Sequence, residues 1–202
     1  MEIGFHKFPS GKKYAYWVDE GKPVFLRNII FLVNRANKKQ VAIVREWGAP
    51  SNSHVWEPPK GQMEWKEFED LGVKPHTVLS KRTVEIEMRK GVLREMCEEA
   101  KVHPRDIHGL KKLPMLYRQA WPESKIPGAQ FQYQFWTATI NDKTLQEAQK
   151  CLQDLVDHPD WKDILPNDLS EKDNISWYAP GKNDHYIRGG FSKKMIDMYY
   201  SQ

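Results

Sequence analysis

The sequence predicts a mixed α/β fold, and three observations lead to that prediction. Strand-sized apolar runs come first, a long stretch with the 3.6-residue period of a helix follows, and a third alternating run precedes two later helical patterns. Elements in this order indicate a sheet layered against helices, an α/β sandwich. At 202 residues, the chain is expected to form a single domain over 1–202.

The first half of the chain is predicted to contain a hairpin, followed by a stiff loop. Residues 27–33 and 41–44 form apolar strand patterns around a turn-like polar segment, which predicts an antiparallel pair. After residues 54–57, two prolines fix an extended backbone that leads into the glycine of Pro58-Pro59-Lys60-Gly61.

Residues 83–101 are expected to form the central helix. On a helical wheel its apolar face holds Leu93, Met96, Cys97 and Ala100, and its opposite face holds Glu95, Glu98 and Glu99. Further along, residues 131–138 alternate as a strand does, and residues 144–157 carry a helical core stripe. A short strand at 175–178 and a terminal helix at 193–200 complete the set.

Composition excludes several classes of protein. No apolar run approaches the roughly 20 residues of a membrane span, and the first residues lack the apolar core of a secretion signal. The two cysteines, Cys97 and Cys151, have no metal-finger spacing, so free thiols in the cytoplasm are expected, with the nucleus as alternative. No zinc-protease pair, P-loop or nucleophile elbow occurs.

The acidic face of the central helix carries the chemistry. Glu95, Glu98 and Glu99 stand at i, i+3 and i+4, so their carboxylates converge and repel one another. Mg²⁺ relieves such repulsion because it prefers hard oxygen ligands, and the adjacent Arg94 can orient a carboxylate. Alone, this pattern is more often a solvated acidic face, and the upstream loop decides otherwise.

Together the two segments resemble the Nudix motif, G-x5-E-x7-R-E-U-x-E-E-x-G-U, where U is a bulky aliphatic residue. Gly61 and Glu67 match its first half, and the second half is matched by Arg94, Glu95, Met96, Glu98, Glu99 and Val102. The lead-in Trp56-Glu57-Pro58-Pro59-Lys60-Gly61 is most similar to that of dinucleoside tetraphosphate (Ap4A) hydrolases.

Two departures from the motif stand out. Glu67 and Arg94 are separated by 26 residues instead of seven, an insert at about 68–86 that looks like a loop over residues 68–76. The first motif glutamate is therefore Glu67, or a residue at the helix start such as Glu85 or Glu87. Lys101 replaces the helix-ending glycine, so a shifted helix cap is expected.

The resemblance implies a Nudix α/β/α sandwich with a mixed central sheet and a catalytic loop and helix. It assigns Mg²⁺, or alternatively Mn²⁺, to the metal ligands Gly61, Glu95, Glu98 and Glu99. It further implies that Arg94 assists and that Glu98 or Glu171 deprotonates the attacking water; taken alone, Glu171 is more typical of a surface loop. Substrate contacts are expected from Arg45, Trp47, Lys60 and Tyr133, although strand-edge packing explains Arg45 and Trp47 equally well.

The substrate implied is a nucleoside diphosphate linked to a group X. A dinucleoside polyphosphate is the first choice, because the segment from Trp56 to Gly61 is most similar to that of Ap4A hydrolases. The 5′ end of a capped or triphosphorylated RNA comes second, since the net charge is +4, the pI is about 8.9 and aromatic residues are abundant. Diphosphoinositol polyphosphates come third, and a non-catalytic RNA-binding Nudix module is the rival of another class. No membrane partner and a monomer or homodimer are expected.

Overall fold

The computed structural model describes residues 1–50, 53–122, 126–182 and 186–202. The chain forms two compact units of interleaved segments. The first unit contains Met1–Ile29, Lys60–Arg94 and Lys112–Trp136, and the second contains Ile30–Pro59, Glu95–Lys111 and Thr137–Gln202. A single domain over 1–202 stays a prediction.

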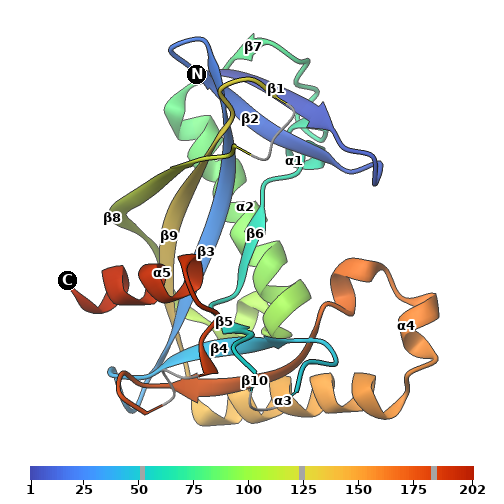
Figure 1. Cartoon of the computed structure of the whole chain (residues 1–202), viewed down its shortest axis with the longest axis vertical. Helices are drawn as coiled ribbons and strands as arrows, with labels where there is room; N and C mark the ends of the chain where they lie inside the picture. Colours follow the sequence, from blue (N-terminus) through green and yellow to red (C-terminus); the bar gives the residue numbers. More distant parts are fainter. Residues whose placement is uncertain (51–52, 123–125, 183–185) are drawn as a thin grey trace. The chain divides into compact units, whose positions relative to one another are not determined.

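An antiparallel meander opens the first unit (Figure 1). It consists of β1 (Glu2–Lys7), β2 (Lys13–Asp19) and the start of β3 (Lys22–Asn34). Glu20 and Gly21 both have positive φ, which gives the two-residue hairpin between β2 and β3 the twist of its strands. Sequence patterning missed β1 and β2, because β2 is half-buried at nearly every position and does not alternate.

The insert belongs to the first unit and is not a free loop. Its segment holds α1 (Lys66–Glu69) and β7 (Thr77–Val78), and β7 pairs antiparallel with β1. The amide of His76 donates to the carbonyl of Ile3 at 2.8 Å, and Phe68 is fully buried. Residues 70–76 form turns and irregular backbone, as expected of a loop, and only residues 68–69 at the end of α1 are helical.

Helix α2 (Lys81–Ala100) begins two residues earlier than expected, since the Ser80 hydroxyl accepts from the Thr83 amide at 3.0 Å and caps it. Just before the insert, β6 (Lys60–Gln62) pairs with β3. Strand β8 (His108–Ala120) was not expected; it pairs with β9 (Gln130–Ile140), which extends the strand predicted at 131–138.

In the second unit, β4 (Val41–Glu46) pairs with β5 (Trp56–Glu57) and β10 (Lys172–Tyr178). Val33 pairs with Val41, which confirms the predicted hairpin. These pairs are antiparallel, and a parallel bridge joins Trp56 to Ile187.

Helices complete the second unit. Helix α3 (Asp142–Asp157) lies along β10 (Figure 1), and the Gln149 amide donates to the Ile175 carbonyl at 2.9 Å. Helices α4 (Trp161–Ile164) and α5 (Phe191–Tyr200) follow, with short 3-10 turns at Pro104–Asp106 and Asn167–Leu169. The predicted α/β class is confirmed. None of the helices in the described residues has the length and apolar character of a membrane span.

Candidate functional site

Arg94 joins the two halves of the split motif within the first unit. Its Nε donates to Oε1 of Glu67 at 3.0 Å, and its Nη2 donates to the carbonyl of Gln62 at 3.3 Å. Oε1 of Glu64 lies 3.7 Å from Nη1. One guanidinium is thus held by three residues of the segment that precedes the insert, so the insert leaves this part of the motif assembled.

Among the three candidate first glutamates, Glu67 is the one that contacts Arg94, the residue that opens the second half of the motif. Glu85 instead pairs with Lys112, and Glu87 pairs with Lys90 on its own helix. Tertiary contact therefore selects Glu67, which sequence spacing alone left open.

The Glu67 carboxylate is buried, with 7% of the residue exposed. Its Oε2 has no hydrogen-bond partner among the described residues. Burial raises the pKa of Glu67, although the Arg94 guanidinium acts in the opposite direction. Gly91 makes this approach of α2 possible, because a Cβ there would lie 3.3 Å from Nδ2 of Asn28 and 3.6 Å from Oε1 of Glu67.

The second unit holds the three carboxylates at the end of α2. Glu95 and Glu99 are buried and Glu98 is half-buried. Lys172, itself 5% exposed, lies between two acids: its Nζ is 3.2 Å from Oε1 of Glu99 and 2.9 Å from Oε1 of Glu57. The other oxygen of Glu57 accepts from the Ser192 hydroxyl at 3.1 Å.

Burial alone would lower the pKa of Lys172, but Glu99 and Glu57 outweigh it and raise the pKa above the ordinary lysine value. Lys172 therefore stays protonated and balances two buried carboxylates. Neither Lys172 nor Glu57 was assigned a role from sequence, because a single lysine at a strand start carries no motif.

Lys101 occupies the motif's glycine position and adopts the glycine's backbone. Its φ is +54°, immediately after the last residue of α2. The expected shift of the cap is therefore wrong. Two hydrogen bonds from Nζ, both 2.6 Å long, run to the carbonyls of Glu98 and Leu169 and hold the side chain over the helix end.

Three predicted site residues gather at the end of β4. The amide of Trp47 donates to the carbonyl of Glu171 at 2.9 Å, and Arg45 donates from Nε to Asp173 at 2.7 Å. Nζ of Lys162 lies 5.1 Å from the centre of the Trp47 ring. Glu171 is exposed and directly precedes Lys172, so this group adjoins the buried acids.

The remaining predicted residues lie in the first unit. Gly61 pairs with Asn28, and the neighbouring Lys60 is half-buried. Tyr133 is only 3% exposed, and its hydroxyl accepts from Nη1 of Arg27 at 3.1 Å. The Arg27 guanidinium lies 3.8 Å from the centre of the Phe131 ring. Arg27 is half-buried and is therefore more exposed to solvent than Tyr133.

The expected metal site at Glu95, Glu98 and Glu99 stays a prediction. Across residues 1–50, 53–122, 126–182 and 186–202, no group of three or more His, Cys, Asp or Glu side chains is placed to hold a metal. The ammonium of Lys172 lies on one side of Glu99, 3.2 Å from its Oε1.

The donor chemistry nevertheless fits a hard divalent cation. The buried acids of the second unit are Glu57, Glu95, Glu99 and Asp173, whereas Lys172 is the only buried cation among its described residues. Buried negative charge in excess favours a bound cation with oxygen ligands.

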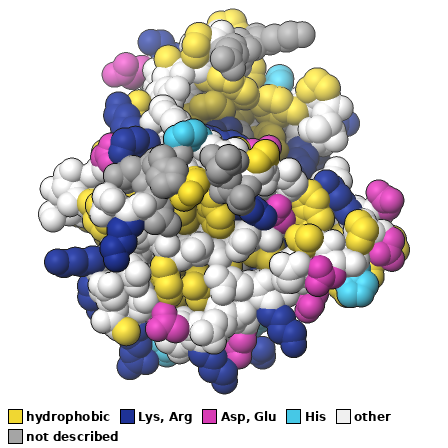
Figure 2. All heavy atoms as spheres, turned by 60° about the horizontal axis from the view of Figure 1, so that its bottom comes forward, with side chains coloured by type: hydrophobic (Ala, Val, Ile, Leu, Met, Phe, Trp, Pro, Cys, Tyr) yellow, Lys and Arg dark blue, Asp and Glu magenta, His cyan; other side chains and the backbone are white. Residues whose placement is uncertain are grey.

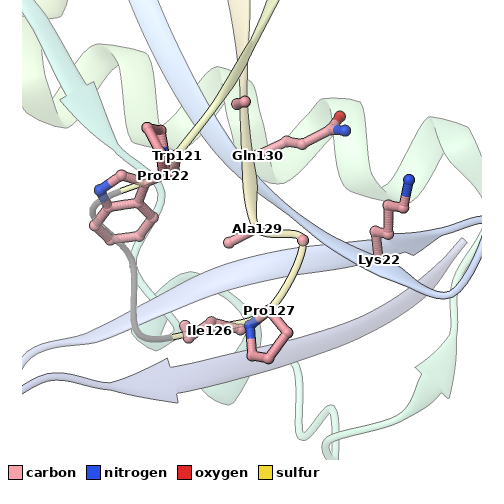
Figure 3. Close-up of a pocket in the computed structure, with 9 residues that line it drawn as sticks. Lys22, Trp121, Pro122, Ile126, Pro127, Ala129 and Gln130 are labelled. Atoms are coloured by element: carbon pink, nitrogen blue, oxygen red, sulfur yellow. The ribbon is translucent and has the colours of Figure 1, made fainter.

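A pocket of about 340 Å³ in the first unit offers no such chemistry (Figure 3). Trp121, Ile126, Pro127 and Gln130 line it, and Lys22 is the one charged side chain among its described lining residues. Its described lining residues supply neither carboxylate ligands nor a base.

No protein-family model matches the chain, and no curated protein matches it. Similar solved structures include a NUDIX hydrolase from Nitrosomonas europaea, with a TM-score of 0.39, 12% identity and 88% of each chain covered. For Shewanella oneidensis NrtR the TM-score is 0.43 and the sequence identity 13%, with 88% of this chain and 61% of NrtR covered. For a C. elegans Ap4A hydrolase binary complex the TM-score is 0.41 and the identity 14%, with 88% of this chain and 94% of the hydrolase chain covered.

Two of these structures are a NUDIX hydrolase and an Ap4A hydrolase, the groups that the motif resembles. Likeness at this level is too low to carry a function, so the function is argued from the residues themselves.

Proposed function

We propose that this protein is a Mg²⁺-dependent hydrolase of phosphoanhydride bonds of the Nudix type. The observation that carries the proposal is the contact between Arg94 and Glu67 at 3.0 Å, across a sequence separation of 27 residues. An accidental match of two motif halves gives no reason for the glutamate of one half to contact the arginine of the other. Two halves of one functional unit, by contrast, are expected to make this contact.

Glu95, Glu98 and Glu99 would hold the metal, and Gly61 as a further ligand stays a prediction from the motif. Bound Mg²⁺ supplies charge neutralisation at the diphosphate and lowers the pKa of water. Glu98 is the half-buried member of the triad, so it is reachable by water and suits the role of proton acceptor. Glu171 is the alternative base, because it is exposed beside Lys172.

Lys172 balances the charge of Glu57 and Glu99, since its ammonium contacts both carboxylates. Arg94 fixes Glu67 at the other end of the motif. Water attacks phosphorus in line, the bond from phosphorus to the bridging oxygen breaks, and the proton of the water passes to the glutamate base.

We propose a dinucleoside polyphosphate as the substrate. The lead-in from Trp56 to Gly61 supports it, as does an aromatic ring at Trp47 with the Lys162 ammonium 5.1 Å from its centre. Arg45 is already neutralised by Asp173. Figure 2 shows Lys and Arg side chains interspersed with Asp and Glu side chains on the face that it draws.

The test is turnover of a panel by the pure protein with Mg²⁺: diadenosine tetraphosphate, capped RNA, nucleotide sugars and inositol pyrophosphates. We expect ATP and AMP from diadenosine tetraphosphate, a shallow salt dependence and no activity in EDTA. Glu98→Gln should lower kcat at least about a hundredfold, whereas Glu147→Gln, an exposed glutamate on α3, should not. Activity that survives EDTA would overturn the proposal. Steep salt dependence with capped RNA as the better substrate would make RNA the substrate.

A further inference from the structure

A second cavity lies wholly within the first unit, away from the motif. It has a volume of about 500 Å³ and lies among β2, β3, β8, β9 and the first turns of α2. That volume falls in the range of small-molecule sites, roughly 300–1,000 Å³. Val84 and Met88 line it, 10 and six residues before Arg94, which is about 15 and 9 Å along the helix axis. The cavity is thus separate from the Arg94–Glu67 contact.

The lining is apolar and rich in sulfur. Met1, Met88 and Met115, three of the chain's seven methionines, contribute to it together with the fully buried Leu26. Methionine side chains adapt their shape and make favourable contacts between sulfur and aromatic rings. Such a lining suits a planar aromatic ring.

One polar group in this wall lacks a partner. Trp17 lines the cavity, and its buried Nε1–H has no hydrogen-bond acceptor in the part of the chain that the structure describes. Buried hydrogen-bond donors are nearly always satisfied. An unsatisfied N–H in a residue that lines a cavity therefore indicates that a ligand bound there supplies the acceptor. The Arg118 guanidinium lies over the Trp17 ring, 5.1 Å from its centre, and holds the indole in place.

The rim of the cavity is positive. Lys112 is balanced by Glu85 and Arg118 by Asp19. Lys81 also lines the cavity and has no ionic partner among the described residues. It is the first residue of α2, where the helix dipole also favours an anion.

We propose that this cavity binds an aromatic anion of small-molecule size. Its ring lies among the methionines, an acceptor on it receives the Trp17 Nε1–H, and its negative group faces Lys81. This site is independent of the proposed hydrolase activity, since it uses none of the motif residues.

Indole NMR of the ¹⁵N-labelled full chain tests this proposal, with naphthalene-1-sulfonate as the probe. Trp17→Phe assigns one of the eight indole N–H resonances, and Arg118→Gln, which removes the cation over the ring, confirms the assignment by shifting it. We expect a saturable shift of the Trp17 resonance. Affinity should fall about two- to fivefold in Lys81→Gln and for the uncharged naphthalene-1-sulfonamide, the size of an exposed charge contact.

Lys143→Gln, a change at an exposed lysine on α3, is the matched control and should leave the affinity unchanged. A Trp17 resonance that does not shift, or that shifts without saturation, would overturn the cavity as a binding site. Equal affinity for the sulfonamide and the sulfonate, with no effect of Lys81→Gln, would overturn the anionic ligand.

Discussion

Single residues at the end of α2 carry unusual conformations and charges. Lys101 accepts a left-handed backbone, which costs a side-chain-bearing residue about 1–2 kcal/mol. Its ammonium offsets that cost by binding the Glu98 carbonyl, which the helix end leaves without an intrahelical donor, and the Leu169 carbonyl of a separate 3-10 turn. Where the motif's glycine adopts this backbone without strain, Lys101 compensates for the strain with a charged side chain that caps the helix.

Substitutions at Lys101 separate these two effects. Lys101→Ala keeps the strain and loses the ammonium, so it should lower the free energy of unfolding by roughly 1–3 kcal/mol. Lys101→Gly also loses the ammonium but relieves the strain, so it should be about 1 kcal/mol more stable than the alanine variant. Urea unfolding measures both. A glycine variant less stable than the alanine variant would contradict the left-handed cap.

Glu67 has a raised pKa in the folded state, which makes stability depend on pH. A raised folded pKa contributes stability that is fully present below the ordinary value of 4.5 and is lost as pH rises through the folded value. The stability of the wild type relative to Glu67→Gln should therefore decrease from about pH 4 to about pH 7.

Chemical denaturation at several pH values measures that difference. Glu147→Gln, at an exposed helix position, should give a flat difference over the same range. If the difference for Glu67 instead grew with pH, attraction to Arg94 would outweigh burial.

Among the elements, β7 determines how the insert is held. The amide of Leu79 donates to the carbonyl of Met1 at 2.9 Å beside the paired strands β1 and β7. We predict that deleting residues 68 to about 82 of the insert changes substrate preference more than metal binding.

Leu79→Pro removes this donor and should cost roughly 1–3 kcal/mol of stability. It should also speed hydrogen exchange of the amides in β1 and β7. Val78→Ala, at a side chain that is 73% exposed, keeps the backbone bonds and should change little. Equal exchange rates in both variants would show that backbone pairing does not hold the insert.

Across the whole molecule the net charge is +4, yet the buried charges of the second unit are mostly acidic. Lys172→Met leaves Glu57 and Glu99 without their shared cation, and breaking a buried pair typically costs about 3–5 kcal/mol. Because Mg²⁺ can replace the lost charge, it should raise the melting temperature of this variant more than that of the wild type.

Thermal unfolding with and without Mg²⁺ measures this difference, and Lys143→Met, at an exposed lysine, is the control. An equal effect of Mg²⁺ on Lys172→Met and the wild type would indicate that no cation binds among these acids.

The sequence by itself determined the α/β class, the helix with its glutamates, the hairpin of β3 and β4, and α3. Each of these depends on contacts between near neighbours, so periodicity reveals it. The sequence did not predict strands β1, β2 and β8, because their residues do not alternate between apolar and polar. Pairing with other strands stabilises them instead.

Only the tertiary structure selected Glu67 over Glu85 and Glu87, and only it placed Lys172 between Glu57 and Glu99. The partners in these contacts are separated by 27 residues for Glu67 and Arg94 and by 115 for Lys172 and Glu57. Contacts at such separations form when burial removes charged groups from water and requires them to pair, and no local pattern encodes which partner each group meets.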